Sequence, residues 1–360
     1  MIQYNIHHVN GLYFQITQDE GKDREYEVQF LDRESKKLIY ETKLKVNGWA
    51  RLERQYLSDI SVIVSYNGRV VKQINFLDEI KGKRVFISFD SKALGDTLAW
   101  LPYCEEFAKH YDCQVIVSTF KNFFFEESYP DLIFAERGAV VHNLVGMFTL
   151  GWFWDSKKEP VCPILIPLQK AATNILHLPY EEIIPRIDFE PKERPIAGKY
   201  VCISKHSTAQ LKHWYYWQEV IDFLVGEGYQ VIEISNEETN DLNNILVLED
   251  KSFENTMNYI HHCEFFIGLS SGLGWLTWAM QKKQFMIANF TNPDHEYSKN
   301  TTRIINHDVC HGCWHNPLFK FDKGNWNWCP EHEDTPRHFE CHKSITSEMV
   351  INEIKKYIYG

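Results

Sequence analysis

The 360-residue sequence lacks a strongly basic stretch, and its 38 Lys and Arg residues are outnumbered by 49 Asp and Glu residues. The resulting formal net charge of -11 repels a polyphosphate backbone, which argues against a nucleic-acid-binding protein. A long apolar run is also missing: the most apolar stretch, AVVHNLVGMFTLGWFW, is interrupted by His142 and Asn143 and is shorter than a bilayer span. The chain does not open on a basic leader with an apolar block, so we expect a cytoplasmic protein without a membrane span.

Familiar nucleotide-binding fingerprints are absent as well. The chain has no Walker A loop, no complete GxGxxG pattern and no repeat at a fixed period. Cysteine is sparse except in the segment DVCHGCWHNPLFKFDKGNWNWCPEHEDTPRHFECHK, which carries four of the nine cysteines within 32 residues. In a reducing compartment such a cluster is more often a metal site than a pair of disulfides.

The pattern of apolar and polar residues changes near residue 78. Before it, short alternating runs such as YEVQFL and ISVIVSY, separated by the turn signals VNG and YNG, predict an antiparallel β-domain, which we interpret as a packing or oligomerisation module. After it, apolar strands alternate with helical segments, and the proline-bearing stretch IPRIDFEPKERPIAGKY divides them, which predicts an α/β fold with two Rossmann-like domains. The expected division is a β-domain at 1–78, α/β domains at 79–190 and 191–308, a cysteine-rich segment at 309–345 and a C-terminal helix at 346–360.

Loops that follow predicted strands carry the candidate site residues, because ligands of parallel sheets bind at the carboxyl ends of strands. In FISFDSKALGDTLAWLP, Asp96 stands at the start of a helix, where it either faces a ligand or caps the helix. In ISKHSTAQLKHWYYW, the residues Ser207, Thr208 and Lys212 offer hydroxyls and an ammonium group to a phosphate near a helix N-terminus. A solvated loop with a capping hydroxyl is the alternative interpretation of this second loop.

A third loop, in FIGLSSGLGWLTWAM, leads from a strand directly into a helix through Ser270, Ser271, Gly272 and Gly274. Glycines and hydroxyls at such a turn can bind a diphosphate through backbone amides. Two anion-binding loops in one domain are better evidence than either alone, because a diphosphate needs several converging donors.

The four clustered cysteines have the spacing C-x2-C-x15-C-x11-C: Cys310, Cys313, Cys329 and Cys341. Four thiolates close a tetrahedral site and leave no open position, so we expect one structural zinc or iron ion whose loss would not touch chemistry directly. A nucleic-acid zinc ribbon is disfavoured, because the second pair is not C-x2-C and the chain is acidic. Nearby histidines can replace one thiolate: His311, His315, His332, His338 and His342.

The stretches LGDTLAWLP, STAQLKHW and GLSSGLGWLTWAM, in this order, resemble three motifs of ADP-heptose glycosyltransferases. With the cysteine cluster and the leading β-domain, they make nearly the whole chain similar to the bacterial autotransporter heptosyltransferase family, which modifies serines on the repeated β-solenoid of adhesins. The resemblance implies a GT-B fold of the glycosyltransferase family 9 type, an ADP-heptose donor and an adhesin acceptor. It also implies iron as the metal and a large homo-oligomer, with a dodecamer suggested.

The same resemblance implies roles for individual residues. Asp96 would be the catalytic base that takes the proton of the acceptor hydroxyl, and Lys212 would contact the diphosphate. Ser271, Gly272 and Leu273 would present backbone and hydroxyl donors to that same group. Lys212 and helix amides would then stabilise the leaving diphosphate, so no catalytic divalent metal is needed.

Two points of the resemblance stay open. Ser270 stands where heptosyltransferases commonly have an Asp that contacts the sugar, which leaves the transferred sugar undecided. Glu237 is a candidate contact of the ribose or adenine, and Glu238 is an equal alternative.

Two other functions remain as alternatives. A heptosyltransferase acting on lipopolysaccharide or another glycan would differ in labelling a saccharide instead of a protein. A non-catalytic, metal-stabilised assembly protein that kept the fold would lack a carboxylate within reach of the sugar.

Overall fold

The computed structural model describes residues 2–19, 24–53, 59–153, 162–207, 209–237, 239–319 and 328–360. The chain forms two compact units. Unit 1 consists of Met1–Lys92, Trp100–Pro163 and Gln169–Glu181. Unit 2 consists of Ala93–Ala99, Ile164–Leu168 and Glu182–Gly360.

Unit 1 contains a seven-stranded mixed sheet in the order β10-β9-β8-β11-β1-β2-β5. Its strands are β1 (Gln3–His8), β2 (Leu12–Gln18), β5 (Trp49–Leu52), β8 (Arg84–Phe89), β9 (Gln114–Ser118), β10 (Ile133–Phe134) and β11 (Leu144–Leu150). The strands from β10 to β1 are parallel, whereas β2 runs antiparallel to both β1 and β5. The helical elements of this unit are η1 (Phe76–Ile80), α2 (Pro102–Tyr111), η2 (Asn122–Phe124) and, from its second residue on, α3 (Leu168–Leu176). The short helix η3 (Pro163–Leu165) begins at the last residue of a unit 1 segment and continues in unit 2.

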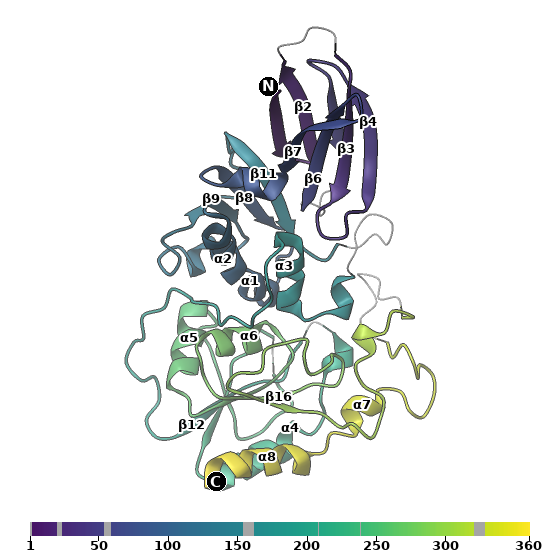
Figure 1. Cartoon of the computed structure of the whole chain (residues 1–360). Coiled ribbons are helices and arrows are strands. Elements are labelled where there is room, and N and C mark those ends of the chain that lie inside the picture. Colours follow the sequence, from purple (N-terminus) through teal and green to yellow (C-terminus); the bar gives the residue numbers. More distant parts are fainter. Residues whose placement is uncertain are drawn as a thin grey trace. The chain divides into compact units, whose positions relative to one another are not determined.

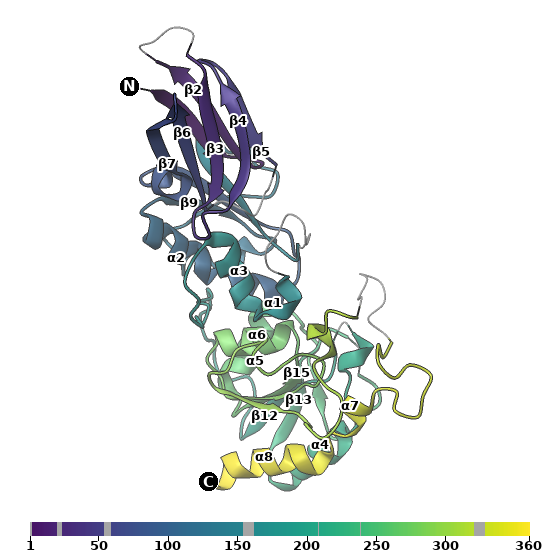
Figure 2. The ribbon, with the colours of Figure 1, turned by 45° about the vertical axis from the view of Figure 1, so that its right-hand side comes forward.

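A second sheet of unit 1 is fully antiparallel, with the order β4-β3-β6-β7. Its strands are β3 (Tyr26–Asp32), β4 (Leu38–Leu44), β6 (Ile60–Tyr66) and β7 (Arg69–Asn75). Phe14 of β2 and Phe30 of β3 are fully buried, with ring centroids 6.4 Å apart, so side chains of the two sheets share a core. Figures 1 and 2 show β2 beside β3 in both views.

Two of the turn signals of the N-terminal region, at 9–11 and 66–68, form hairpin turns. Asn67 and Gly68 connect β6 to β7, and both have positive φ (50° and 73°), as a two-residue hairpin turn requires. Gly11 ends the turn between β1 and β2 with φ of 86°, and a Cβ there would lie 2.0 Å from the carbonyl oxygen of Leu52. Only glycine fits this position, because the neighbouring backbone cannot move away cheaply.

The first 78 residues divide between the two sheets of unit 1. Strands β1, β2 and β5 continue the sheet of β8, while β3, β4, β6 and β7 form the antiparallel sheet. Alternating hydrophobicity predicts a strand but not the sheet it joins, so the sequence did not reveal this division. The domain boundaries at residues 78, 190, 308 and 345 stay predictions.

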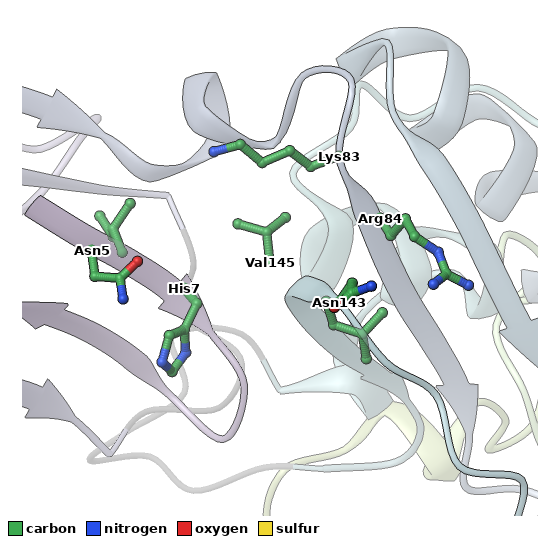
Figure 3. A pocket seen from close by; sticks show the side chains of 8 residues that line it. Asn5, His7, Lys83, Arg84, Asn143 and Val145 are labelled. Carbon is green, nitrogen blue, oxygen red and sulfur yellow. The ribbon is translucent and has the colours of Figure 1, made fainter.

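A cavity of about 380 Å³ lies in unit 1, at the amino-terminal side of the pair His8 and Gly146 that joins β1 to β11. Figure 3 shows side chains of β1 on one side of it and those near the starts of β8 and β11 on the other. The described lining residues include none of the predicted site residues: Asn5, Ile6, His7, Lys83, Arg84, Asn143, Leu144 and Val145.

Unit 2 is built on a six-stranded parallel sheet in the order β14-β13-β12-β15-β16-β17. Its strands are β12 (Tyr200–Ser204), β13 (Gln230–Glu233), β14 (Leu246–Val247), β15 (Phe266–Leu269), β16 (Gln284–Ile287) and β17 (Thr301–Ile304). Its helical elements include α1 (Leu94–Trp100), η4 (Gln210–Lys212), α4 (Trp217–Gly226), α5 (Phe253–His262), α6 (Gly272–Ala279), η5 (Cys313–His315), α7 (Glu340–Lys343) and α8 (Ser347–Tyr359). The alternation of strands and helices expected from the sequence is confirmed.

Helices cover both faces of this sheet. Figures 1 and 2 show α5 and α6 on one face, with α4 and α8 on the other. The C-terminal helix α8 buries Val350 and Ile354 completely in the core that α4 shares with β12 and β15. None of the helices in the described part of the chain is long and apolar enough to cross a membrane.

The strand order places a topological switch point in unit 2. From β12 the chain moves outward to β13 and β14, and then returns to the other side of β12 with β15. Loops leaving neighbouring strands in opposite directions open a crevice at the carboxyl ends of these strands, where α/β proteins bind ligands.

Candidate functional site

The loops after β12 and β15 meet at this switch point. The Ser207 hydroxyl and the Lys212 ammonium both donate to the carbonyl oxygen of Ser270, at 3.5 Å and 3.2 Å. His213 lies in the same loop, with its Nε2 3.0 Å from the carbonyl oxygen of Ser207. The structure therefore brings together three of the predicted donor-binding residues from two loops.

Helix α6 begins directly after the second of these loops. Ser271 has extended backbone dihedrals, and its hydroxyl oxygen accepts a hydrogen bond from the Gly274 amide at 3.4 Å, so it is the N-cap of the helix. The amides of Gly272 and Leu273 belong to the first turn, where amides have no acceptor within the helix. These amides suit an anion, whereas the Ser271 hydroxyl is engaged in capping.

Two glycines bring the starts of α1 and α6 close together. A Cβ on Gly95 would lie 2.9 Å from Cδ1 of Trp275, and a Cβ on Gly272 would lie 3.3 Å from Cβ of Leu94. Asp96 follows Gly95 as the third residue of α1, so it does not occupy the N-cap position. Its side chain is 9% exposed, and it is carried to the turn that starts α6.

Lys212 is surrounded by charged groups and an aromatic ring. Burial lowers the pKa of Lys212, Glu296 and then Asp96 oppose that shift, and Arg303 reinforces it. The ammonium also lies 5.6 Å from the centroid of the Phe290 ring. Asp96 is thus close enough to Lys212 to act on it electrostatically. A catalytic base and a contact of the diphosphate must lie this close to serve one site.

Glu296, a carboxylate that is 7% exposed in the loop after β16, is not among the residues predicted from the sequence. Burial alone would raise its pKa, but Arg303, His295, Ser270 and Lys212 lower the pKa of Glu296 to about 2. Its partners come from loops distant in sequence and from β17, and no local pattern in TNPDHEY indicates them.

Glu233 is a second missed carboxylate, fully buried at the end of β13. It accepts hydrogen bonds from the amides of Ser235 at 2.8 Å and Lys205 at 3.3 Å, so it fixes the loops after β13 and β12. Burial raises the pKa of Glu233, and these hydrogen bonds oppose the rise. A sequence signal was present here, because a lone acid inside the apolar strand QVIEIS needs buried partners.

The remaining predicted donor-binding residues are Thr208 and Glu237, with Glu238 as the alternative to Glu237. Glu237 is exposed in the loop after β13, where its carbonyl oxygen accepts a hydrogen bond from Lys251 at 3.1 Å. Burial lowers the pKa of His206, and the negative charge of Glu237 opposes part of this shift. Thr208 and Glu238 lie outside the described residues.

The four clustered cysteines lie close to one another. Cys329 and Cys341 are 3% and 4% exposed, and Cys310 and Cys313 are partly buried. Burial, with smaller contributions from the thiols of Cys310 and Cys329, raises the pKa of Cys341 to about 12. Buried thiols that disfavour each other's ionisation fit a site in which a cation stabilises the thiolates.

A compact group of possible ligands includes one of these cysteines. The ligand atoms of Cys310, His332 and Glu340 all lie within 4.8 Å of one another. This group differs from the four-thiol set in its imidazole and carboxylate, and His332 is one of the histidines considered as a replacement. Thiolate, imidazole and carboxylate all bind zinc and iron, so the residues present fit either metal.

Residues 170–319 match the model of glycosyltransferase family 9 (heptosyltransferase). The autotransporter heptosyltransferase Aah of Escherichia coli is 31% identical over 356 residues, which cover 92% of this chain and 88% of Aah. The inactive autotransporter heptosyltransferase BimC of Burkholderia thailandensis is 25% identical over 350 residues, which cover 92% of this chain and 82% of BimC.

A solved structure extends this likeness to three dimensions. The iron-containing dodecameric glycosyltransferase TibC of enterotoxigenic E. coli superimposes with a TM-score of 0.84 at 27% identity, covering 98% of this chain and 95% of TibC. TibC has also been solved in complex with ADP-D-beta-D-heptose, and that structure gives a TM-score of 0.83 at 27% identity, over 99% of this chain and 95% of TibC. The chain therefore has a GT-B-like fold and belongs to the autotransporter heptosyltransferase family of glycosyltransferases.

Proposed function

We propose that this glycosyltransferase moves a heptose from ADP-heptose to serine hydroxyls of an autotransporter adhesin, in the cytoplasm as the sequence predicts. One observation carries the proposal: Lys212, Ser207, the start of α6 and Asp96 converge where β12 and β15 end. An ammonium, helix-start amides and a carboxylate are what a diphosphate leaving group and a hydroxyl nucleophile require. The ADP-heptose complex of TibC supports the choice of donor.

In the proposed reaction the serine oxygen forms a bond to the anomeric carbon of the heptose. The bond between that carbon and the phosphate oxygen breaks, and ADP leaves with the electron pair. Asp96 accepts the proton of the serine hydroxyl, while Lys212 and the amides of Gly272 and Leu273 stabilise the negative charge on the departing diphosphate. These groups supply the stabilisation themselves, so the proposal requires no catalytic divalent metal.

A structural metal and self-assembly belong to the same proposal. One iron ion, with zinc as the alternative, is held by Cys310, Cys313, Cys329 and Cys341, and it shapes the segment around them. The description of TibC as iron-containing and dodecameric supports both the metal and a homo-oligomer of that size. Light scattering of the purified protein gives the number of subunits.

Mass spectrometry of an adhesin passenger co-expressed with this protein tests the proposed function. The expected result is the mass of one or more heptoses on serine-containing peptides. Label on lipopolysaccharide or another glycan, with an unmodified adhesin, would establish the saccharide-acceptor alternative. BimC is named an inactive autotransporter heptosyltransferase, so a non-catalytic role stays the second alternative. Absence of label on any acceptor, in a protein that does bind ADP-heptose, would support this alternative.

Replacing Lys212 by Ala is expected to weaken ADP binding roughly 10- to 100-fold, because a charge-assisted hydrogen bond to the diphosphate is lost. Since burial lowers the pKa of Lys212, wild-type affinity should also fall as rising pH removes the proton. Titration calorimetry with ADP at several pH values measures both effects. Lys205→Ala is the matched control, since this lysine also follows β12 but pairs with Asp241. If Lys212→Ala bound ADP as tightly as the wild type, Lys212 would not be a contact of the diphosphate.

A further inference from the structure

We propose that Glu296 is a positioning residue of the donor site, whose carboxylate fixes the turn at Ser270 and keeps a negative charge beside the Lys212 ammonium. The inference rests on the proposed function, because it takes Lys212 as a contact of the donor diphosphate. Glu296 itself is not expected to touch the donor, since its oxygens are engaged by the protein.

The carboxylate of Glu296 ties together three elements. Its Oε1 accepts hydrogen bonds from the hydroxyls of Ser270 and Thr291, the latter at 3.1 Å. Its Oε2 accepts from Arg303 of β17 at 2.5 Å and lies 3.1 Å from the same Thr291 hydroxyl. Arg303 also donates to the Thr291 hydroxyl oxygen at 2.5 Å. The loop after β15, the loop after β16 and β17 therefore converge on one buried carboxylate.

Ser270 links this carboxylate to the donor site. Its hydroxyl donates to Glu296, while its carbonyl oxygen accepts hydrogen bonds from Ser207 and Lys212. The hydrogen bond from the Ser270 hydroxyl to Glu296 fixes the turn and thereby the position of the Ser270 carbonyl oxygen. The Lys212 ammonium is consequently oriented by a residue that Glu296 holds.

The second contribution of Glu296 is its charge. The charged and titratable groups that act electrostatically with Lys212 are Glu296, Asp96, Arg303, His295 and His342. Glu296 is the largest of the influences that oppose the effect of burial on Lys212, and Asp96 is the next. Because the pKa of Glu296 is about 2, its carboxylate stays ionised at neutral and alkaline pH.

The direction of the effect follows from the sign of these charges. A partly buried lysine whose pKa is lowered loses its proton, and with it the electrostatic attraction to a diphosphate, as pH rises through that pKa. Removing the negative charge of Glu296 lowers the pKa of Lys212 further, so the loss of ADP affinity begins at a lower pH. A purely structural Glu296–Arg303 pair would instead change the stability of the protein and leave this pH dependence in place.

The test is calorimetric titration of the full-length protein with ADP across neutral and alkaline pH. We expect Glu296→Gln to move the alkaline fall in ADP affinity to lower pH, with about a tenfold higher Kd for each pH unit of displacement. Glu233→Gln is the matched control: it also removes a buried carboxylate that accepts backbone hydrogen bonds, but Glu233 is not among the charges acting on Lys212. Its alkaline fall should coincide with that of the wild type.

Superimposable pH curves of Glu296→Gln and wild type would overturn the inference, even if the variant melted at a lower temperature. If Lys212→Ala still weakened ADP binding, the proposed function would survive that result. Should Glu296→Gln fail to fold, Glu296→Gln with Arg303→Gln leaves no uncompensated buried charge and serves for the same titration. Glu296 acts on Lys212 more strongly than Arg303 does, so the pair of substitutions should displace the curve in the same direction.

Discussion

Asp96→Asn is expected to slow heptose transfer by about 10²- to 10⁴-fold, because the amide keeps the shape of the side chain but cannot accept the serine proton. At neutral pH, ADP affinity should change little, since the contacts proposed for the diphosphate are Lys212 and the start of α6. At alkaline pH it should fall earlier than in the wild type, because Asp96 also opposes the lowering of the pKa of Lys212. Initial rates of label transfer from ADP-heptose to a purified adhesin passenger, together with calorimetry of ADP binding, measure the two quantities separately.

Asp90→Asn provides the control for this substitution. Asp90 is an exposed carboxylate a few residues upstream, directly after β8, and it has no role in the proposed chemistry. Transfer by Asp90→Asn should match the wild type. If Asp96→Asn retained near wild-type turnover, Asp96 would be removed from the mechanism, whatever its place beside Lys212.

Cys341→Ser is expected to release the metal and to loosen the segment at 309–345. A structural metal site contributes its binding free energy to folding, on the order of 10 kcal/mol in small zinc modules. The two larger sheets have their own buried cores, so the protein should remain folded with a local defect. Elemental analysis measures the metal, and hydrogen exchange of peptides from this segment measures the loosening.

The structure adds an effect of metal loss that the sequence did not predict. The carbonyl oxygen of Cys341 accepts a hydrogen bond from Asn289, and the amide of Trp314 donates to the carbonyl oxygen of Phe290 at 3.1 Å. Phe290 in turn packs beside Lys212. We therefore expect weaker ADP binding in the metal-free variant, in place of the earlier expectation that chemistry is untouched.

Cys113→Ser is the control, because this partly buried cysteine lies in unit 1 and outside the cluster. It should retain the metal. Less than about a tenth of an equivalent of iron plus zinc in the wild type would contradict the site itself. Full metal content in Cys341→Ser would instead point to the group of Cys310, His332 and Glu340 as ligands.

The sequence predicted the elements of unit 2 well because their signals are local. Apolar runs of strand length alternate with helical segments, and hydroxyls and glycines follow the strands, so the loops of the candidate site could be named from the sequence. The prediction of turns at Asn67 and Gly68 succeeded for the same reason, since two residues with positive φ need Asn and Gly.

The other features of the fold and of the candidate site depend on contacts between residues that are distant in sequence. Gly95 and Gly272 are far apart in the chain, and only the fold shows that both are needed for the close approach of α1 and α6. The carboxylate of Glu296 meets Ser270 and Arg303 from two other elements, which no spacing rule reveals. Pairing of β1 with β11 likewise joins segments that the hydrophobic pattern cannot relate.

Hydrogen–deuterium exchange of the full-length wild-type protein, with and without ADP-heptose, shows whether the loops after β12 and β15 and the start of α1 form the donor site. We expect slower exchange with ADP-heptose in peptides covering residues 93–99, 204–214 and 268–276. Protection confined to peptides around the cavity of unit 1, at residues 3–8 and 143–145, would contradict it.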